Sequence, residues 1–228
     1  MMDRNLGATS ATPGDVGALG LLYQWGRKYG QGYSGNLYGG NHNVLGQTSD
    51  ATTPELSEGG VSLQGGQSEN NKNVFYTRTD SPYDWLYSQN DALWNSGTED
   101  VPVKTEYDPC PEGWRVPVFA ELDELCRNHS SWTTDVYGRA GYWFCGAKSY
   151  SKDVPQIFLS MNGSVDSYSG TNSNRDLWGY YWSSTSRTYD SYCIAFHEDT
   201  IFRDPPFSDR VSGYSVRCIR VTDEVAEL

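Results

Sequence analysis

The sequence predicts a mixed domain built from several strands, one clear helix and long loops. Its 228 residues suit one large domain. Aromatic residues make up 14% of the chain, with 8 Trp and 17 Tyr, and can fill a core although the apolar fraction is only 37%. The 24 glycines, with abundant Asn, Ser and Thr, indicate many turns. We therefore expect one domain over residues 1–221, followed by a frayed acidic tail at 222–228.

The N-terminal third combines one core strand with a long insertion. Residues 19–25 (LGLLYQW) form a compact apolar run bounded by glycines, which is typical of a core strand. Residues 26–73 are rich in Gly, Asn, Ser, Gln and Thr and hold few large apolar side chains. Such a segment buries little surface, so we expect a loop-rich insertion and no second domain.

Short elements are expected after the insertion. Residues 73–77 (NVFYT) are predicted as a short strand. Residues 82–86 and 91–94 are predicted as single helical turns, anchored by Trp85 and Trp94.

The clearest helix signal lies in the middle of the chain. Residues 110–117 (CPEGWRVP) read as a turn, and Pro117 suits a first helical position because its missing N–H costs nothing there. The helix predicted over 118–127 places apolar side chains at spacings of three and four residues and carboxylates toward water. The buried side chains would be Val118 or Phe119, Leu122, Leu125 and Cys126, and the exposed ones Glu121, Asp123 and Glu124.

Five further strands are expected in the C-terminal half. The last is predicted to alternate, with Tyr214, Val216 and Cys218 on one face and Ser215, Arg217 and Ile219 on the other. The predicted strands are 141–147, 156–160, 180–184, 192–197 and 214–220.

Composition excludes several classes of partner. The net charge of −12 would repel nucleic-acid phosphates, which argues against nucleic-acid binding. No apolar run is long enough to predict a membrane span. The first residues (MMDRNLGATS) lack the apolar core of a signal peptide, so we expect either a protein that stays inside the cell or, preferably, a chain that continues upstream.

The five cysteines lack the paired spacing of a zinc site. In an exported protein we favour a disulfide between Cys110 and Cys218, whose long loop could contribute about 4–5 kcal/mol by the loop-entropy model. In a reducing compartment the same cysteines would be small buried hydrophobes. The sequence leaves both alternatives open.

No catalytic arrangement is visible. The histidines, His42, His129 and His197, lie in dissimilar contexts and without metal-ligand spacing. No GxSxG, phosphate-binding Gly-rich loop, HExxH or EF-hand pattern occurs. We therefore expect a protein without enzymatic activity and without a cofactor.

The segment 186–212 has an unusual composition. It contains no Lys, Gln, Met or Trp and a single Glu, Glu198, where the rest of the chain predicts about four residues of these five types. Randomising both adenines of an AAC codon yields none of these five amino acids. This bias indicates targeted diversification of a binding surface.

The same segment offers rigid aromatic side chains and charges of both signs, the residue types of binding hot spots and paratopes. Within it, Cys193 and Ala195 are expected to face the core as alternate strand residues. Pro205-Pro206 predicts a loop over 199–211 with exposed phenylalanines. The candidate ligand-binding residues are Arg187, Tyr189, Asp190, Tyr192, His197, Asp199, Phe202, Arg203, Asp204, Phe207, Asp209 and Arg210.

Five motifs, found in the same order in a known family, flank this segment: MDRNLGA near the N-terminus, LLYQWGR at 21–27, CPEGWRVP at 110–117, YWSST at 181–185 and GYSVRCIR at 213–220. From Asp3 to about Arg220 the chain resembles the Bacteroidetes-type major paralogous domain, which is similar to the C-type lectin and formylglycine-generating-enzyme folds. The resemblance implies an α+β domain of C-type lectin-like fold, with a twisted antiparallel sheet, one or two helices and long loop insertions.

The segment between YWSST and GYSVRC further resembles the variable proteins of diversity-generating retroelements of gut bacteria and their phages. That resemblance implies a ligand site formed by exposed positions from Ser186 to Arg210, with Glu198 fixed. It also implies that Met1 follows missing first-strand residues of the family. The scaffold residues would be Trp182, Ser183, Gly213, Tyr214, Val216 and Cys218.

Two other functions of related folds fit poorly. The copper-binding cysteine pair of formylglycine-generating enzymes has no counterpart near the last strand, and the Ca²⁺-dependent sugar motifs of C-type lectins are missing. We therefore expect a non-catalytic display protein for varying protein or cell-surface ligands, located at a cell surface or on a phage particle. The alternatives are a surface or fimbrial-adhesin domain with a fixed partner and, less favoured, an oxidase.

Overall fold

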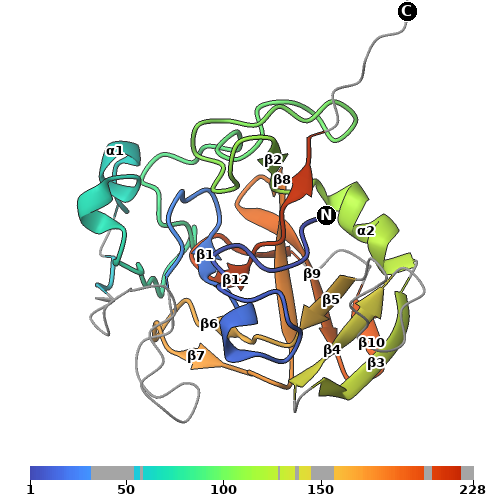
Figure 1. The fold of residues 1–228 in the computed structure, drawn as a ribbon. Coiled ribbons are helices and arrows are strands. Elements are labelled where there is room, and N and C mark those ends of the chain that lie inside the picture. The colour runs from blue at the N-terminus through green and yellow to red at the C-terminus, as the bar shows by residue number, and fades with distance from the viewer. Residues whose placement is uncertain are drawn as a thin grey trace, which may run out of the picture.

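The computed structural model describes residues 1–31, 54–56, 59–127, 129–136, 139–144, 157–202 and 207–221. Its largest sheet is mixed, because β12 pairs with β8 in parallel while the other pairings of its described strands are antiparallel. The strand order is β10-β9-β8-β12-β6-β7, with β1 added to β12 and β11 added to β9. Figure 1 shows the long β8 and β9 running through the middle of the domain. The strands are β1 (Leu22–Gln24), β6 (Ser164–Val165), β7 (Asn172–Ser173), β8 (Gly179–Arg187), β9 (Asp190–His197), β10 (Thr200–Phe202), β11 (Phe207–Asp209) and β12 (Gly213–Ser215).

Two smaller sheets flank this one. In the first, β13 (Ile219–Arg220) pairs with β2 (Trp114–Arg115). The second joins β3 (His129–Val136), β4 (Arg139–Phe144) and β5 (Ile157–Ser160). These strands, with few helices, place the domain in the α+β class.

The helix α2 (Phe119–Arg127) confirms the strongest sequence signal, with one correction at its start. Pro117 precedes the helix by two residues and is not its first residue. Val118 occupies the N-cap instead, and its N–H donates to Glu121 Oε2, so the helix begins with half of a capping box. Glu121 also pairs with Arg115, so this carboxylate is tied to β2 and does not simply face water. Leu122 and Cys126 are buried, whereas Phe119 and Leu125 are partly buried.

The large sheet separates two apolar clusters. Trp182 of β8 joins the first cluster with Trp25, Trp85 and Trp94. Its neighbour Tyr181 joins the second cluster, which lies against α2. Successive strand residues point to opposite faces, so one strand supplies both clusters. This arrangement fixes β8 and β9 between two packed layers.

Several predicted short elements are absent from the described chain. Residues 73–77 form no strand; Val74 and Thr77 make only isolated bridges. Residues 82–86 and 91–94 are turns and bends without helix. Trp85 and Trp94 nevertheless anchor these segments as expected, because both are buried and their indole N–H groups donate to the carbonyls of Trp25 and Arg27.

The C-terminal strand is interrupted. Residues 216–218 lie between β12 and β13, and the N-terminal segment pairs with them instead: Met2 N–H donates to the Cys218 carbonyl and Leu6 N–H to the Val216 carbonyl. Tyr214, Val216 and Cys218 all belong to the first cluster, which confirms the predicted inward face. Arg217 is also buried. Its guanidinium donates to Asn5 Oδ1 and to backbone carbonyls, and these hydrogen bonds compensate for its burial.

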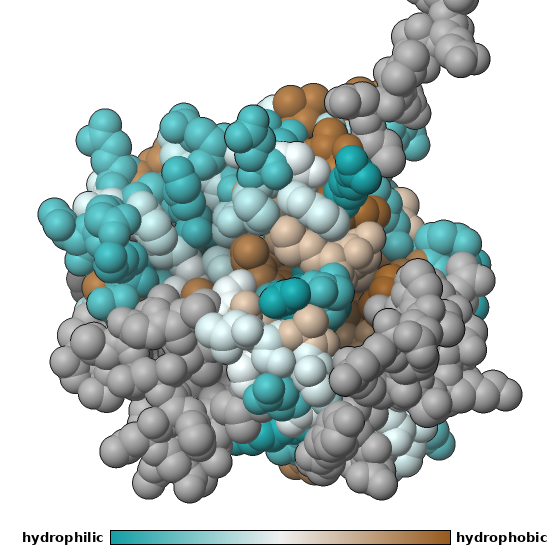
Figure 2. Space-filling view, viewed as in Figure 1, coloured by the Kyte–Doolittle hydropathy of each residue, from teal (hydrophilic) through white to brown (hydrophobic). Residues whose placement is uncertain are grey.

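The described part of the insertion is tied to the core by Arg27. Its guanidinium donates to the carbonyls of Gly66, Asn71 and Val74 and lies 4.9 Å from the Tyr76 ring centroid. These contacts hold α1 (Leu63–Gly66) and the 3₁₀ turn at Glu69–Asn71; a second such turn lies at Val16–Ala18. The surface over α1 is hydrophilic (Figure 2), as expected of an insertion that buries little. Residues 32–53, 57–58 and the tail 222–228 lie outside the described chain.

Of the two alternatives for the cysteines, a disulfide or small buried hydrophobes, the structure shows the disulfide. Cys110 and Cys218 are bonded, 108 residues apart in sequence, and join the turn before β2 to the segment before β13. In the part of the chain that the structure describes, no helix is long and apolar enough to cross a membrane.

Replacing both cysteines by Ala should lower the free energy of unfolding by about 2–5 kcal/mol, because the open chain gains conformational entropy when unfolded. Urea denaturation with and without dithiothreitol measures this. The reductant should lower the midpoint of the wild type and leave that of Cys110→Ala/Cys218→Ala unchanged. A wild-type midpoint that ignores complete reduction would contradict the stabilising role.

Candidate ligand-binding surface

Five of the sequence-predicted residues meet at one end of the large sheet. Arg187 on β8 lies opposite Asp190 on β9, and Asp190 lies opposite Asp209 on β11. One row further along, Tyr192 on β9 lies opposite Phe207 on β11. Directly opposed residues share a face, and positions two apart along a strand do so as well. We call Arg187, Asp190, Tyr192, Phe207 and Asp209 the β9–β11 patch.

Ring contacts fix the geometry of the β9–β11 patch. The Arg187 guanidinium carbon lies 3.9 Å from the Phe207 ring centroid, a cation–π distance. The Tyr192 ring lies 5.1 Å from the ring of Phe119 at the start of α2. Phe207 remains 50% exposed and Arg187 is also exposed, while the other three side chains are half-buried. The patch thus combines a packed inner side with an accessible outer side.

Residues outside the biased segment hold the patch in place. Thr185 Oγ1 accepts from the Phe119 N–H at 2.9 Å and donates to Glu99 Oε1 at 2.6 Å. The Ser184 N–H donates to the Pro117 carbonyl at 2.7 Å. These bonds join β8 to the start of α2 and to the loop that carries Glu99. Sequence analysis missed Glu99 and Thr185, because no local pattern reveals a contact across 86 residues.

The two carboxylates of the patch, those of Asp190 and Asp209, belong to directly opposed residues, and no described cation pairs with them. Burial, and then the neighbouring Asp190, raise the pKa of Asp209 above its ordinary value. Neither carboxylate forms an ion pair or a hydrogen bond with another described residue. Like charges directly opposite each other on paired strands are destabilising. The patch therefore carries an excess of negative charge that the described protein does not neutralise.

His197 and Phe202 belong to a second group on the other face of the sheet. His197 lies five positions after Tyr192 on β9, an odd offset, so the two side chains point to opposite faces. The Trp178 ring lies 4.4 Å from His197, 5.5 Å from Phe202 and 5.7 Å from Tyr180, measured between centroids. Sequence analysis also missed Trp178, whose aromatic context (WGYYW) reads equally well as core. The structure does not unite the two groups.

The remaining predicted residues lie elsewhere. Tyr189, 59% exposed, sits in the turn between β8 and β9, whereas Asp199 is exposed in the turn between β9 and β10, at the opposite end of β9. Glu198 begins that second turn with a positive φ of 33°, and its carbonyl accepts from the Tyr142 hydroxyl. Arg203 and Asp204 lie outside the described residues.

The structure corrects the prediction of a loop over residues 199–211. β10 and β11 both pair with β9, β10 near its end and β11 near its start, so the chain follows one edge of the sheet on either side of residues 203–206. Proline is compatible with a sheet edge or an interruption of a strand, where no ladder N–H is needed. The prolines therefore exclude an interior strand but not edge strands. Exposure of Phe202 and Phe207 agrees with the expectation.

Arg210 is the clearest error among the predicted site residues, because its side chain is 0% exposed. The guanidinium pairs with Asp84 and Asp91, donates to the carbonyls of Asn90 and Asp190, and lies 4.4 Å from the Trp25 ring centroid. A buried cation requires such partners. Arg210 is therefore a structural residue, and the candidate surface ends before it.

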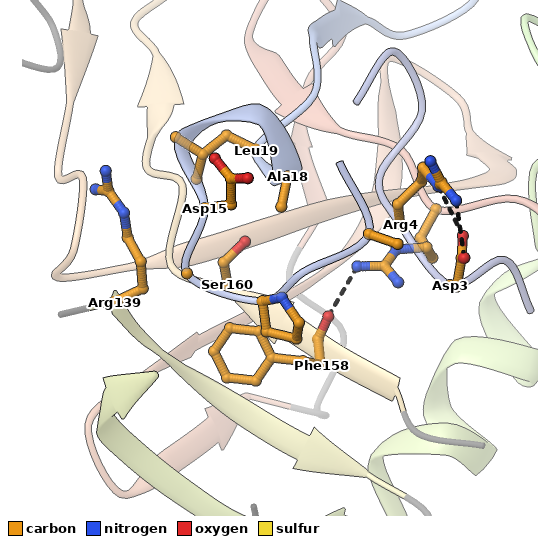
Figure 3. A pocket seen from close by; sticks show the side chains of 12 residues that line it. Asp3, Arg4, Asp15, Ala18, Leu19, Arg139, Phe158 and Ser160 are labelled. Atoms are coloured by element: carbon orange, nitrogen blue, oxygen red, sulfur yellow. Dashed lines mark hydrogen bonds and ion pairs between the residues drawn. The ribbon is translucent and has the colours of Figure 1, made fainter. Parts of the chain in front are cut away.

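Other features of the described chain do not indicate a catalytic site. A small hollow near the N-terminus is lined by Asp3, Arg4, Asp15, Arg139 and Arg217 among others, and by none of the predicted site residues (Figure 3). Within the described ranges, no three His, Cys, Asp or Glu side chains are placed to hold a metal ion. The buried side chains of Cys126 and Cys193 belong to different apolar clusters.

Replacing Arg210 by Met should lower the free energy of unfolding by about 3–5 kcal/mol, because Asp84 would be left buried without its cation. Adding Asp84→Asn should restore part of that loss. Urea denaturation measures both variants, and the exposed Arg220→Met serves as the matched control. Equal midpoints for Arg210→Met and Arg220→Met would contradict the anchoring role.

Asp209→Asn should raise the free energy of unfolding at neutral pH by about 0.2–1 kcal/mol. The pKa of Asp209 is raised in the folded protein, so its ionisation costs stability above that pKa. The gain should therefore shrink as pH falls through the raised pKa and vanish below the ordinary value of 3.8. Thermal unfolding across pH, with exposed Asp100→Asn as control, tests this. A destabilised Asp209→Asn would reveal a stabilising partner for the carboxylate.

Comparison with known proteins adds no relative to this geometry. No protein-family model, no curated protein and no solved structure matches the chain. A proposal for function therefore rests on the residues and on their arrangement.

Proposed function

We propose that this chain is a non-catalytic display protein of C-type lectin-like fold. Its β9–β11 patch, together with Tyr189, binds protein or cell-surface ligands that vary as the segment 186–212 is diversified. The observation that carries the proposal is the separation within this segment between buried frame residues and accessible aromatic and charged residues. Such a protein would act at a cell surface or on a phage particle.

The frame side of this separation is extensive. Cys193, Ile194 and Phe196 of β9 are buried in the two clusters, and Arg210 and Val211 close the segment inside the core. Substitutions at these positions would create cavities or leave charges unpaired. Diversification that preserves the fold must spare them.

The accessible side has the chemistry of a binding surface. Tyr189, Tyr192 and Phe207 offer rigid apolar area, and Arg187 offers a cation already stacked on an aromatic ring. Exposed substitutions usually change stability by less than about 0.5 kcal/mol, so affinity can change while the fold is kept. A surface or fimbrial-adhesin domain with a fixed partner could use the same surface, and the pattern of natural variation separates the two functions.

Sequencing the gene across a population tests the proposal directly. We expect changes that cluster at Arg187, Tyr189, Asp190, Tyr192, Phe207 and Asp209 and that follow adenines in a template copy beside a reverse transcriptase gene. Variation spread evenly over the chain, or concentrated at buried positions such as Phe196, would contradict display and favour a fixed partner.

Stability measurements give a second test. Trp182→Ala and Val216→Ala should each lower the free energy of unfolding by about 2–5 kcal/mol, since both side chains are fully buried. Tyr189→Ala and Phe207→Ala should leave it nearly unchanged, and Tyr192→Ala should lie between because its ring packs on Phe119. A Phe207→Ala loss as large as that of Trp182→Ala would show a frame residue and contradict its assignment to the binding surface.

A further inference from the structure

The β9–β11 patch contains two carboxylates whose counter-ion is missing among the described residues. Asp190 and Asp209 are directly opposed across β9 and β11, and the pKa of Asp209 is raised by burial and by Asp190. The nearest cation in register, Arg187, lies over the Phe207 ring instead of pairing with either carboxylate. The other nearby cation, Arg210, is buried and pairs with Asp84 and Asp91. Among the described residues, Asp190 and Asp209 therefore form an unfavourable charge pair without a counter-ion.

An exposed aromatic ring lies beside the same carboxylates. Phe207, two residues before Asp209, is 50% exposed, and Tyr168 is 51% exposed. The Tyr168 ring lies 6.3 Å from that of Tyr83. Tyr83 is the main cause of the raised pKa of Tyr168, and the charge of Asp209 contributes as well. The exposed Phe207 ring beside unpaired carboxylates is not explained by the core.

This combination favours a cationic binding group, and guanidinium above ammonium. A planar guanidinium can donate hydrogen bonds to two carboxylates and stack on an aromatic ring at the same time. Arg187 on Phe207 already shows within the chain that a guanidinium fits this ring. The net charge of −12 would also draw a basic partner toward the protein.

We infer that the partner of this surface is a basic protein segment that places an arginine side chain between Asp190 and Asp209 and against the exposed ring of Phe207. This inference rests on the proposed function and adds the chemical class of the partner. The two carboxylates then cost stability in the free protein and gain their counter-ion on binding. Neutralising Asp190 and Asp209 should weaken binding but stabilise the fold. A loss of binding in such a variant therefore cannot be caused by unfolding.

A random peptide library displayed on phage is the probe. It is selected against the wild type, against Asp190→Asn/Asp209→Asn and against Asp100→Asn/Glu112→Gln, a control with the same change in net charge at exposed sites elsewhere. The affinities of the enriched peptides are then measured by fluorescence polarisation at low and high salt. Melting temperatures verify that each variant is folded.

Peptides selected on the wild type should contain arginine and should bind Asp190→Asn/Asp209→Asn at least about tenfold more weakly, a change of about 1.4 kcal/mol. Their binding to the control variant should be unchanged, and salt should weaken it. Replacing the peptide arginine by citrulline should cause the same loss.

Three results would overturn the inference. Enriched peptides without a basic residue that still lose affinity on Phe207→Ala would leave the proposed binding surface intact and refute its cationic partner. If the peptides bound the double variant and the control variant equally weakly, the loss of affinity would come from net charge alone and not from Asp190 and Asp209. A library that yields no peptide sensitive to any substitution in the β9–β11 patch would refute both the inference and the proposed function.

Discussion

The buried guanidinium of Arg210 is the interaction on which the rest of this structure depends. It joins Asp84 and Asp91 of the loop-rich middle to the start of β9, and it covers Trp25 at the centre of the first apolar cluster. Burial raises the pKa of Asp84, against the opposing effects of the Leu86 N–H and of Arg210. Such a cluster is stable only when its partners are in place. Segments with little regular structure of their own are thereby held against the sheet.

Because Arg210 fixes its end in the core, the segment 186–212 can supply both buried frame residues and exposed surface residues. Between Arg187 and Arg210 the chain crosses the sheet twice, so alternate side chains enter a core or face outward. Cross-strand register then decides which outward residues become neighbours. It brings Arg187, Asp190 and Asp209 into one row and sends His197 and Phe202 to the other face. A binding surface on this frame is smaller than the segment that encodes it.

In the proposed function, electrostatics would link the surface to its partner. The pair Asp190 and Asp209 is unfavourable without a cation, and proteins tolerate such local costs where function needs them. The ring of Phe207 adds apolar area beside this charge. A diversified surface would then keep its frame while its charge and its rings change together, so that one scaffold meets different ligands.

The sequence by itself determined one helix, several of the strands and the composition bias. The spacing of Leu122 and Cys126 predicted α2, and aromatic runs predicted β4, β5, β8 and β9, because helix and strand periods are local properties. Only tertiary structure decided that Arg210 is buried, that Cys110 bonds Cys218 and that the candidate residues divide between two faces. Each of these outcomes depends on segments far apart in the chain, and residue type alone does not encode which of them meet.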